Sequence, residues 1–435
     1  MVRSATREFR NWAGNQVCLP TQQHQPNSTA TVATIVAKAQ SAGERVKAVG
    51  SGHSFTSAAC TTGHLLSLDR MNHVEAIDIE NHRITVQAGI TLADLNRELA
   101  AVGLAMPNLG DIAYQTVAGA IGTATHGTGL LLGNLATTIV GMEIVAGSGE
   151  IIWCDEDTNA DLLAVARVGI GALGVVTKVT IQCVPAFNLH VQESVESLDD
   201  LLDGFADNAA GNDHFEFFWV PGTKRAMVKR NNRTELPAQP ESKPAYFMNK
   251  IVSENLAFGA ICAVAKRRPT LVPKVAKLIS SAAGDRELVD RSDRVFASPR
   301  LVKFCEMEYG IPIEALPEAF RRVRDFARDL GEPIVFPIEC RVSAADDIPL
   351  STAQGRTSAW IAVHRAKGVD YTDYFQGVER IMNDYDGRPH WGKLHFQDAA
   401  SLAPRYAEWD RFMQTREKLD PTGVFRNAYT DRVLG

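Results

Sequence analysis

Residues 50–55 read Gly50-Ser51-Gly52-His53-Ser54-Phe55 and follow an apolar run, 45–49, that is typical of a short buried strand. Two glycines within three residues allow positive φ angles and a close approach of the backbone to a ligand. Successive backbone N–H groups in such a turn form a concave site for an anion. His53 adds a nucleophilic imidazole beside that ligand, although a histidine in a glycine turn can also be only a structural donor. The turn favours a phosphate-containing cofactor that is both cradled and chemically attached.

A second glycine-rich stretch, 116–129 (TVAGAIGTATHGTG), offers many N–H and hydroxyl donors on a nearly bare backbone. Small apolar residues alternate with its glycines, which favours a tightly packed segment over a flexible loop. Neither stretch is a Walker loop, because no Gly-Lys-Ser/Thr follows. The pattern GxGxxG occurs at 169–174, but there it follows a predicted helix and opens a strand, the wrong order for a dinucleotide fingerprint.

Composition limits the class of protein. The chain has 435 residues, which is enough for two or three domains, and its 45% hydrophobic and 22% charged residues are ordinary for a globular protein. A net charge of −6 argues against general nucleic-acid binding. The seven cysteines are widely spaced without a CxxC pair, so neither a metal site nor a thioredoxin-like site is expected. With no secretory signal, we expect reduced thiols and a cytoplasmic protein.

No apolar run reaches the roughly 18 residues of a membrane span. The nearest run, 255–265 (NLAFGAICAVA), is followed by Lys266-Arg267-Arg268. The pattern predicts a buried helix with a basic last turn, and a membrane-surface patch is the alternative. Membrane association is therefore not expected.

Periodicity and turn residues predict an α+β fold that changes character after Pro185. Before it we expect helices at 29–42, 92–102 and 161–168, and strands at 45–49, 64–68, 83–87, 139–145, 150–153 and 175–184. After it we expect an aromatic strand at 215–220, an exposed polar loop at 230–244, an amphipathic helix at 316–330, strands at 334–342 and 359–364, and a turn at 419–425.

Charged residues cluster in the second half. Glu339 and Arg341 lie two apart on a predicted strand with apolar flanks, so both point to one face, which favours a buried pair over a solvated ion pair. Glu306 and Glu308 repeat this spacing with the same ambiguity. His390-Trp391-Gly392-Lys393 is either a surface loop or the wall of a polar pocket.

Together these motifs resemble an aldonolactone oxidoreductase of the vanillyl-alcohol-oxidase flavoprotein superfamily, over nearly the whole chain. The resemblance is carried, in family order, by Asn11-Trp12-Ala13-Gly14, GSGHSF, AGAIGTATHGTG, GALGVVT (171–177), the Glu339/Arg341 pair, HWGK (390–393) and LDPTGVF (419–425). It implies a two-domain α+β flavoprotein with a PCMH-type FAD-binding domain (1–185), a substrate or cap domain with an antiparallel sheet (186–415), and a C-terminal segment (416–435) that returns to the FAD domain.

The resemblance also implies the site residues. FAD is expected to be bonded covalently through His53 to the flavin 8α-methyl group. The other expected cofactor-binding residues are Val49, Gly50, Ser51, Gly52, Ser54, Phe55, Gly110, Asp111, Thr116, Gly119, Gly122, Thr123, Thr125, His126, Gly174 and Val175.

The implied substrate face consists of Glu339, Arg341, Lys393 and His364. The hydroxyl next to the carbonyl of an aldono-1,4-lactone (L-gulono-, L-galactono- or D-arabinono-) is expected to be oxidised by hydride transfer to flavin, giving an ascorbate-type product. Lys393 or Glu339 helps to take the hydroxyl proton, and Arg341 stabilises developing negative charge.

Several alternatives stay open at this point. By the resemblance, glycine at position 110 leaves room for molecular oxygen and favours an oxidase, yet similar bacterial relatives with this glycine are dehydrogenases, so another electron acceptor stays open. Asp111 replaces a serine of alditol oxidase and favours a lactone over an alditol. An alditol or sugar oxidase is the first alternative. A non-catalytic flavin-binding redox sensor is a remote one, against which the charged substrate face argues.

Overall fold

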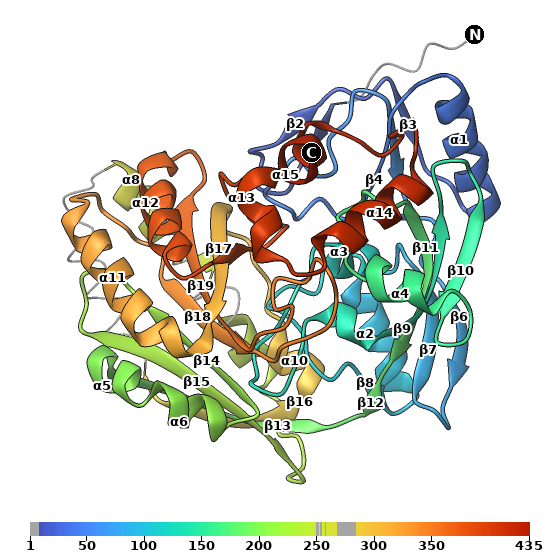
Figure 1. The fold of residues 1–435 in the computed structure, drawn as a ribbon. Helices are drawn as coiled ribbons and strands as arrows, with labels where there is room; N and C mark the ends of the chain where they lie inside the picture. The colour runs from blue at the N-terminus through green and yellow to red at the C-terminus, as the bar shows by residue number, and fades with distance from the viewer. Residues whose placement is uncertain (1–7, 249–251, 253–254, 257, 268–283) are drawn as a thin grey trace.

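The computed structural model describes residues 8–248, 252, 255–256, 258–267 and 284–435, and has two lobes that meet along a large antiparallel sheet (Figure 1). The N-terminal lobe holds a three-stranded parallel sheet, a five-stranded antiparallel sheet and two small ribbons. The parallel sheet comprises β3 (Gln22–His24), β5 (His64–Ser67) and β4 (Val46–Val49), and the ribbons pair β1 (Phe9–Arg10) with β2 (Val17–Cys18) and β8 (Leu104–Ala105) with β12 (Val184–Pro185).

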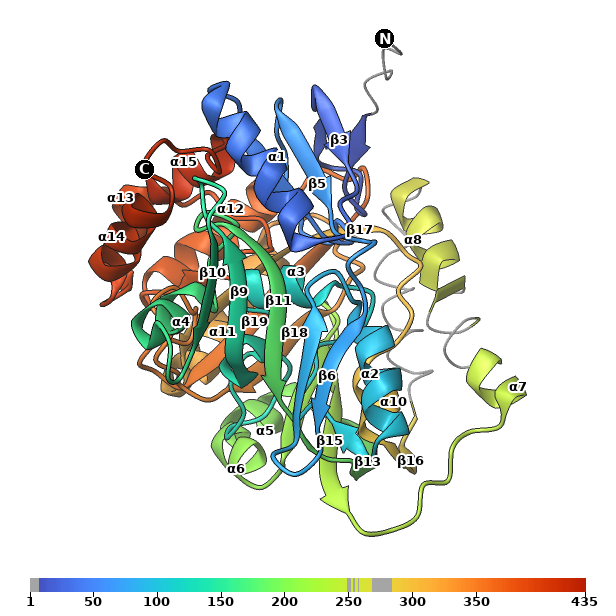
Figure 2. The ribbon, with the colours of Figure 1, turned by 90° about the vertical axis from the view of Figure 1, so that its right-hand side faces the viewer.

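The first predicted helix is confirmed as α1 (Thr29–Ser41), which packs beside the parallel sheet (Figure 2). The Ser28 side chain accepts a hydrogen bond from the Thr31 N–H, which caps the helix start. Gly43 has a φ of +68°, the left-handed conformation that ends many helices.

The five-stranded sheet confirms the predicted hairpin at Gly147–Gly149 and the alternating strand before Pro185. Its order is β10 (Ile151–Asp155), β9 (Ile139–Val145), β11 (Val175–Gln182), β7 (Arg83–Gln87) and β6 (Val74–Asp78). The helices of this lobe are α2 (Leu92–Ala101), α3 (Val117–Gly122) and α4 (Ala160–Ala166).

The second lobe is built on an eight-stranded antiparallel sheet. Its order is β16 (Arg286–Arg291), β13 (Asn188–Ser197), β15 (Arg225–Thr234), β14 (His214–Trp219), β18 (Ile338–Ser343), β19 (Ser358–Ala366), β17 (Phe304–Pro312) and β20 (Arg388–Pro389). One apolar core packs its outer face against α5 (Leu198–Asp203), α6 (Phe205–Ala210), α11 (Leu316–Asp329) and α12 (Thr372–Asn383) (Figure 1). The opposite face is turned toward the N-terminal lobe.

Three local predictions need correction. The predicted loop 230–244 begins as strand, because β15 continues to Thr234. The Arg230 side chain donates to Glu196 and Asn208, which satisfies its polar groups within the sheet. The strand predicted from residue 334 starts at Ile338, after Pro337. Helix α8 (Phe258–Arg267) exists, but it is not buried: Cys262 packs inward, whereas Ala260 and Ala263 are exposed. Ala257 and Arg268 of that prediction lie outside the described residues.

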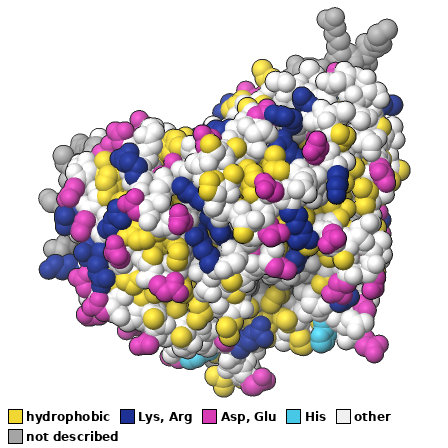
Figure 3. Space-filling model, in the orientation of Figure 1, with side chains coloured by type: hydrophobic (Ala, Val, Ile, Leu, Met, Phe, Trp, Pro, Cys, Tyr) yellow, Lys and Arg dark blue, Asp and Glu magenta, His cyan; other side chains and the backbone are white. Residues whose placement is uncertain are grey.

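The remaining short helices are α7 (Lys243–Tyr246), α10 (Ser292–Phe296) and α13 (Ala399–Leu402), and the chain ends in α14 (Trp409–Leu419) and α15 (Ala428–Leu434). None of the helices in the described part of the chain has the length and apolar character needed to cross a bilayer. Acidic and basic side chains are interspersed over the face seen in Figure 3, in line with the small net charge.

The predicted turn at 419–425 is confirmed and joins the chain end to the N-terminal lobe. The carboxylate of buried Asp420 accepts hydrogen bonds from the backbone N–H groups of Val424 at 2.6 Å and Phe425 at 2.8 Å. The Val424 carbonyl in turn accepts from the N–H of Val46 on β4 at 2.9 Å. This turn therefore extends the edge of the parallel sheet.

Asp420→Ala is expected to lower the free energy of unfolding by about 2–4 kcal/mol, because two buried N–H groups lose a charged acceptor. Chemical denaturation monitored by circular dichroism measures the change. The matched control is Asp431→Ala in the same segment, where the ion pair with Arg426 is exposed and is worth less than about 1 kcal/mol. Equal losses in the two variants would contradict the role assigned to Asp420.

Candidate active site

The His53 turn leaves β4 and lies against the distant HWGK segment. Gly52 has a φ of +69°, which bends the chain back after the strand. The Phe55 N–H donates to the Gly392 carbonyl at 2.7 Å, and the Ser54 hydroxyl donates to the same oxygen at 3.2 Å. Two donors of the His53 turn therefore share one acceptor on a segment more than 330 residues away.

The N-terminal ribbon clamps the same turn. The Trp12 N–H donates to the Gly52 carbonyl at 2.7 Å, and the Asn11 amide donates to the Ser54 carbonyl at 3.0 Å. The Trp12 ring stacks on the His53 ring with centroids 5.5 Å apart. This explains physically why Asn11 and Trp12 accompany the glycine turn in the motif.

His53 combines partial burial with an unused ring nitrogen. Its Nδ1 is buried and has no hydrogen-bond partner among the described residues. Burial, and after it the positive charge of Lys393, lowers the pKa of His53 below its usual value. The imidazole is therefore neutral at neutral pH and keeps a nucleophilic nitrogen.

The second glycine stretch packs directly on the first. Thr116 caps α3 by accepting from the Gly119 N–H at 3.2 Å. A Cβ on Gly50 would lie 2.2 Å from the Thr116 hydroxyl, so only glycine fits there. A Cβ on Gly122 would meet nothing within 4 Å in the described part of the chain. Thr123 of the same stretch lies close to Gly392.

These features fit a bound dinucleotide. The cradle has glycines at its closest contact, open space beside Gly122, and an orphaned nitrogen on His53. Val49 and Phe55 are buried and Ser51 is exposed at the rim. Nucleotide cofactors require this combination of bare backbone and free donors.

The other predicted cofactor residues lie in different surroundings. Gly174 precedes β11 and packs on Ile144 and Val145 of β9, and Val175 begins the strand opposite Val145. Buried Gly110 lies below the His126 carbonyl, which a Cβ would approach to 3.1 Å. Thr125 accepts from the Gln115 amide at 3.3 Å.

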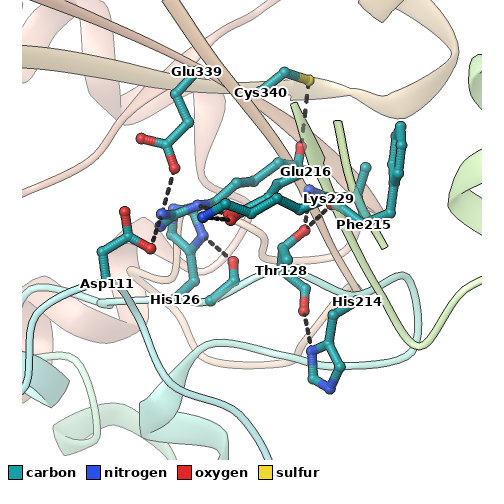
Figure 4. A network of polar contacts seen from close by, with 12 residues as sticks. Asp111, His126, Thr128, His214, Phe215, Glu216, Lys229, Glu339 and Cys340 are labelled. Carbon is teal, nitrogen blue, oxygen red and sulfur yellow. Dashed lines mark hydrogen bonds and ion pairs between the residues drawn. The ribbon is translucent and has the colours of Figure 1, made fainter. Parts of the chain in front are cut away.

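The end of the glycine stretch is joined to the large sheet by hydrogen bonds. The Val342 N–H of β18 donates to the Thr128 hydroxyl at 3.2 Å, and that hydroxyl donates to the Phe215 carbonyl of β14 (Figure 4). The His214 ring bonds the Thr128 carbonyl at 2.9 Å. The two lobes are thereby fixed relative to each other at the cofactor cradle.

Arg341 lies at the centre of a buried carboxylate cluster on the inner face of the sheet. Its guanidinium lies 2.6 Å from Asp111 and 3.1 Å from Glu216, and it contacts Glu339 (Figure 4). Lys229 lies opposite Glu216 in the β14–β15 register and approaches it to 3.2 Å. Asp111 therefore belongs to the same cluster as the carboxylates of the sheet. Its second carboxylate oxygen lies 2.5 Å from the Arg300 guanidinium.

Lys393 forms the centre of a second cluster. Its ammonium contacts Glu306 and lies 4.0 Å from Glu308, both on β17. Glu306 pairs in register with His364 of β19, whose Nε2 lies 3.5 Å away. The His126 Nε2 lies 3.4 Å from Glu308. The predicted residues Lys393, His364 and His126 are thus joined by two glutamates.

The two clusters shift the pKa values of their glutamates in opposite directions. Burial raises the pKa of Glu339 to about 8, against the effect of Arg341 and with the help of Asp111 and Glu216. Burial alone would raise the pKa of Glu306, but Lys393 lowers it to about 2. Burial alone would lower the pKa of Lys393, but Glu306 and Glu308 raise it. These shifts favour the charged ammonium of Lys393, whereas they favour the protonated form of Glu339 below a pH of about 8.

A cavity of about 560 Å³ opens beside the Arg341 cluster. Its walls include Asp111, Glu216, Lys229 and Arg341. The volume suits a small polar molecule rather than a polymer.

Sequence reasoning missed Glu216, Lys229 and Arg300. Glu216 lies between the buried aromatic residues Phe215 and Phe217, whose side chains belong to the outer-face core, so period-2 alternation could have placed it on the inner face. Lys229 reaches the cluster because β15 pairs with β14 in a register that places it opposite Glu216, and the sequence alone does not reveal that register. Arg300 lies in a segment without a periodic pattern.

The fold and the cradle together define a flavoprotein oxidoreductase. A family model described as FAD binding domain matches residues 20–155, and one described as D-arabinono-1,4-lactone oxidase matches residues 179–433. The chain belongs to the D-arabinono-1,4-lactone oxidase family. The predictions of fold class, of an FAD-binding domain and of an aldonolactone oxidoreductase are thereby confirmed.

Relatives match over the full length. The L-gulono-1,4-lactone dehydrogenase of Mycobacterium tuberculosis is 44% identical over 430 residues, covering 98% of this chain and 99% of that protein. The L-gulonolactone oxidase of Bos taurus is 34% identical over 434 residues, covering 98% of both. A cholesterol oxidase from Brevibacterium sterolicum superposes with a TM-score of 0.83 at 18% identity, covering 99% of this chain and 97% of that one, which shows the shared fold.

Proposed function

We propose that this protein oxidises the hydroxyl next to the carbonyl of an aldono-1,4-lactone, of the L-gulono, L-galactono or D-arabinono type. The observation that carries the proposal is the contact between the His53 turn and the Lys393 segment through Gly392, because it joins a cofactor cradle to a charged substrate face. FAD supplies the hydride acceptor when it is bound. An ascorbate-type compound would be the product.

In this proposal three charged side chains divide the work at the substrate. The planar guanidinium of Arg341 donates hydrogen bonds to the substrate oxygen on which negative charge develops. Lys393, held as a cation by Glu306 and Glu308, orients the lactone by hydrogen bonding and does not act as a base. Glu339 is the acceptor of the hydroxyl proton, because its raised pKa of about 8 suits proton transfer near neutral pH. His364 is fixed by the Pro337 carbonyl at 3.0 Å and orients Glu306.

We also propose that His53 is bonded covalently to the flavin 8α-methyl group. The neutral imidazole and its unpartnered Nδ1 support this assignment. His53 would hold the flavin through a C–N bond in place of one methyl C–H bond. The two electrons and the two protons, one from the methyl group and one from the imidazole, would pass to the flavin, and the electron acceptor of the enzyme would reoxidise it. The glycine stretches, from Gly50 to Gly52 and from Thr116 to His126, would hold the rest of FAD.

His53→Ala is expected to release all of its flavin on acid precipitation, whereas the wild-type protein keeps the yellow colour in the pellet. Absorbance of the supernatant measures the release. The matched control is His390→Ala, which removes a buried histidine near the same cradle and leaves the tether intact. Release of flavin from the wild-type protein would rule out the bond.

A substrate panel tests the function itself. L-Gulono-1,4-lactone, L-galactono-1,4-lactone, D-arabinono-1,4-lactone and xylitol are compared by anaerobic flavin bleaching, and turnover is then measured with oxygen and with a dye acceptor. We expect a lactone to bleach the flavin and xylitol to fail, because Asp111 is engaged with two arginines. Bleaching by xylitol alone would favour the alditol oxidase alternative. The acceptor arm separates an oxidase from a dehydrogenase.

A further inference from the structure

Two cysteines outside the proposed active site lie next to each other. Cys18 belongs to β2 of the N-terminal ribbon, and Cys60 follows the His53 turn by seven residues. The Cys18 side chain lies close enough to Cys60 to raise the pKa of the Cys60 thiol. Both are partly accessible, whereas Cys154, Cys183, Cys262, Cys305 and Cys340 are buried.

The backbone register supports this pairing independently of the side chains. β3 and β5 run parallel, with Gln22 opposite His64. The Thr21 N–H donates to the Thr62 carbonyl at 3.0 Å, so the same register continues before the strands begin. Cys18 and Cys60 each precede this pairing by four residues, so the chain brings both cysteines to the same end of the parallel sheet. Paired strands lie about 4.8 Å apart, and a disulfide requires a Cα separation of roughly 4.4–6.8 Å.

We propose that Cys18 and Cys60 form a reversible disulfide when the protein meets a hydroperoxide. With hydrogen peroxide, the Cys18 sulfur attacks the O–O bond, which gives a sulfenic acid and one water. The Cys60 sulfur then displaces the hydroxyl group as a second water, and the S–S bond forms. Both thiol protons leave in water, the two sulfurs lose two electrons, and the peroxide gains them.

The order of attack follows from the surroundings of the two thiols. Burial, and after it the neighbouring Cys18, raises the pKa of Cys60 to about 12. Cys60 therefore stays protonated, which favours Cys18 as the attacking atom.

The disulfide would link the ribbon that contacts the His53 turn to the segment, residues 57–60, that follows the turn. On one side is the ribbon that carries Asn11 and Trp12. On the other side the Asn427 amide donates to the carbonyls of Ser57, Ala58 and Cys60 at 3.0, 3.0 and 2.8 Å. Oxidation would therefore fasten the ribbon to a segment anchored by the C-terminal helix.

The test treats the full-length flavoprotein with hydrogen peroxide, alkylates it under denaturing conditions and maps it by mass spectrometry. We expect the loss of two of the seven alkylatable thiols, an intact mass lower by two hydrogens, and linked peptides containing Cys18 and Cys60. A reductant restores both thiols. Cys18→Ser is expected to abolish the link without creating a new one, and Cys154→Ser to leave it unchanged.

A second measurement separates the proposed consequence from the bridge. Amide hydrogen exchange of residues 9–18 is expected to slow on oxidation of the wild-type protein and to stay constant in Cys18→Ser. Full alkylation of Cys18 and Cys60 after peroxide treatment, or a link from either to another cysteine, would overturn the proposal. Both readouts are independent of lactone oxidation.

Discussion

Arg341→Ala is expected to slow the reduction of bound flavin by a lactone about 10²–10³-fold, with flavin content unchanged. Arg341 contributes a guanidinium that Asp111, Glu216 and Glu339 hold in one orientation. Its removal takes away the proposed donor for the developing oxyanion and leaves Asp111, Glu216 and Glu339 without the cation that holds them together. Anaerobic stopped-flow absorbance at saturating lactone measures the rate directly.

Two controls make the Arg341 result specific. Arg341→Lys keeps a positive charge but loses the planar fork, so it is expected to recover only part of the rate. Arg300→Ala removes the second partner of Asp111 without removing Arg341, and is expected to have the smaller effect. A wild-type reduction rate in folded, flavin-loaded Arg341→Ala would refute the assigned role.

Glu339→Gln is expected to remove the pH dependence of flavin reduction. In the wild-type protein the rate should rise about tenfold per pH unit and level off above the Glu339 pKa of about 8, because only the carboxylate accepts the hydroxyl proton. The glutamine variant keeps the shape of the side chain but accepts no proton, so its rate should be low and flat. Stopped-flow rates between pH 6 and pH 10 distinguish the two profiles.

The same group leaves a signature in stability. The folded-state pKa of Glu339 lies above its unfolded value, so its contribution to stability is fully present below the unfolded pKa and is lost as pH rises through about 8. Glu306 has the opposite sign, since its folded-state pKa of about 2 makes its contribution present above the unfolded pKa and lost in acid. Glu306→Gln therefore serves as the control when the free energy of unfolding is measured against pH.

If the Glu339→Gln variant shows the wild-type dependence of flavin reduction on pH, Glu339 is excluded as the base.

Local chemistry made much of this protein predictable. The glycine turn at Gly50 and Gly52, the cap of α1 and the reversal at Asp420 depend on neighbouring residues, so the sequence reveals them directly. The pair Glu339 and Arg341 was predictable as a buried pair from its strand spacing and its apolar flanking residues.

The rest depends on register between distant strands. Glu306 and Glu308 lie on β17, which is buried on both faces, so no alternation shows which face the carboxylates share. Their partners His364 and Lys393 meet them only through the β17–β19 pairing and the turn after β20. Arg230 depends on distant residues in the same way. Its polar side chain predicted a loop, yet it lies in the sheet because the distant side chains of Glu196 and Asn208 accept its hydrogen bonds.

The shared Gly392 carbonyl has a consequence for protein engineering. Phe55 and Ser54 grip this oxygen one residue before Lys393, and Thr123 lies beside the same glycine. Under the proposed attachment of the flavin at position 53, a redesign of that position would therefore also move the ammonium of Lys393. Cofactor linkage and lactone affinity would then be coupled in this scaffold, and variants selected for one trait should drift in the other.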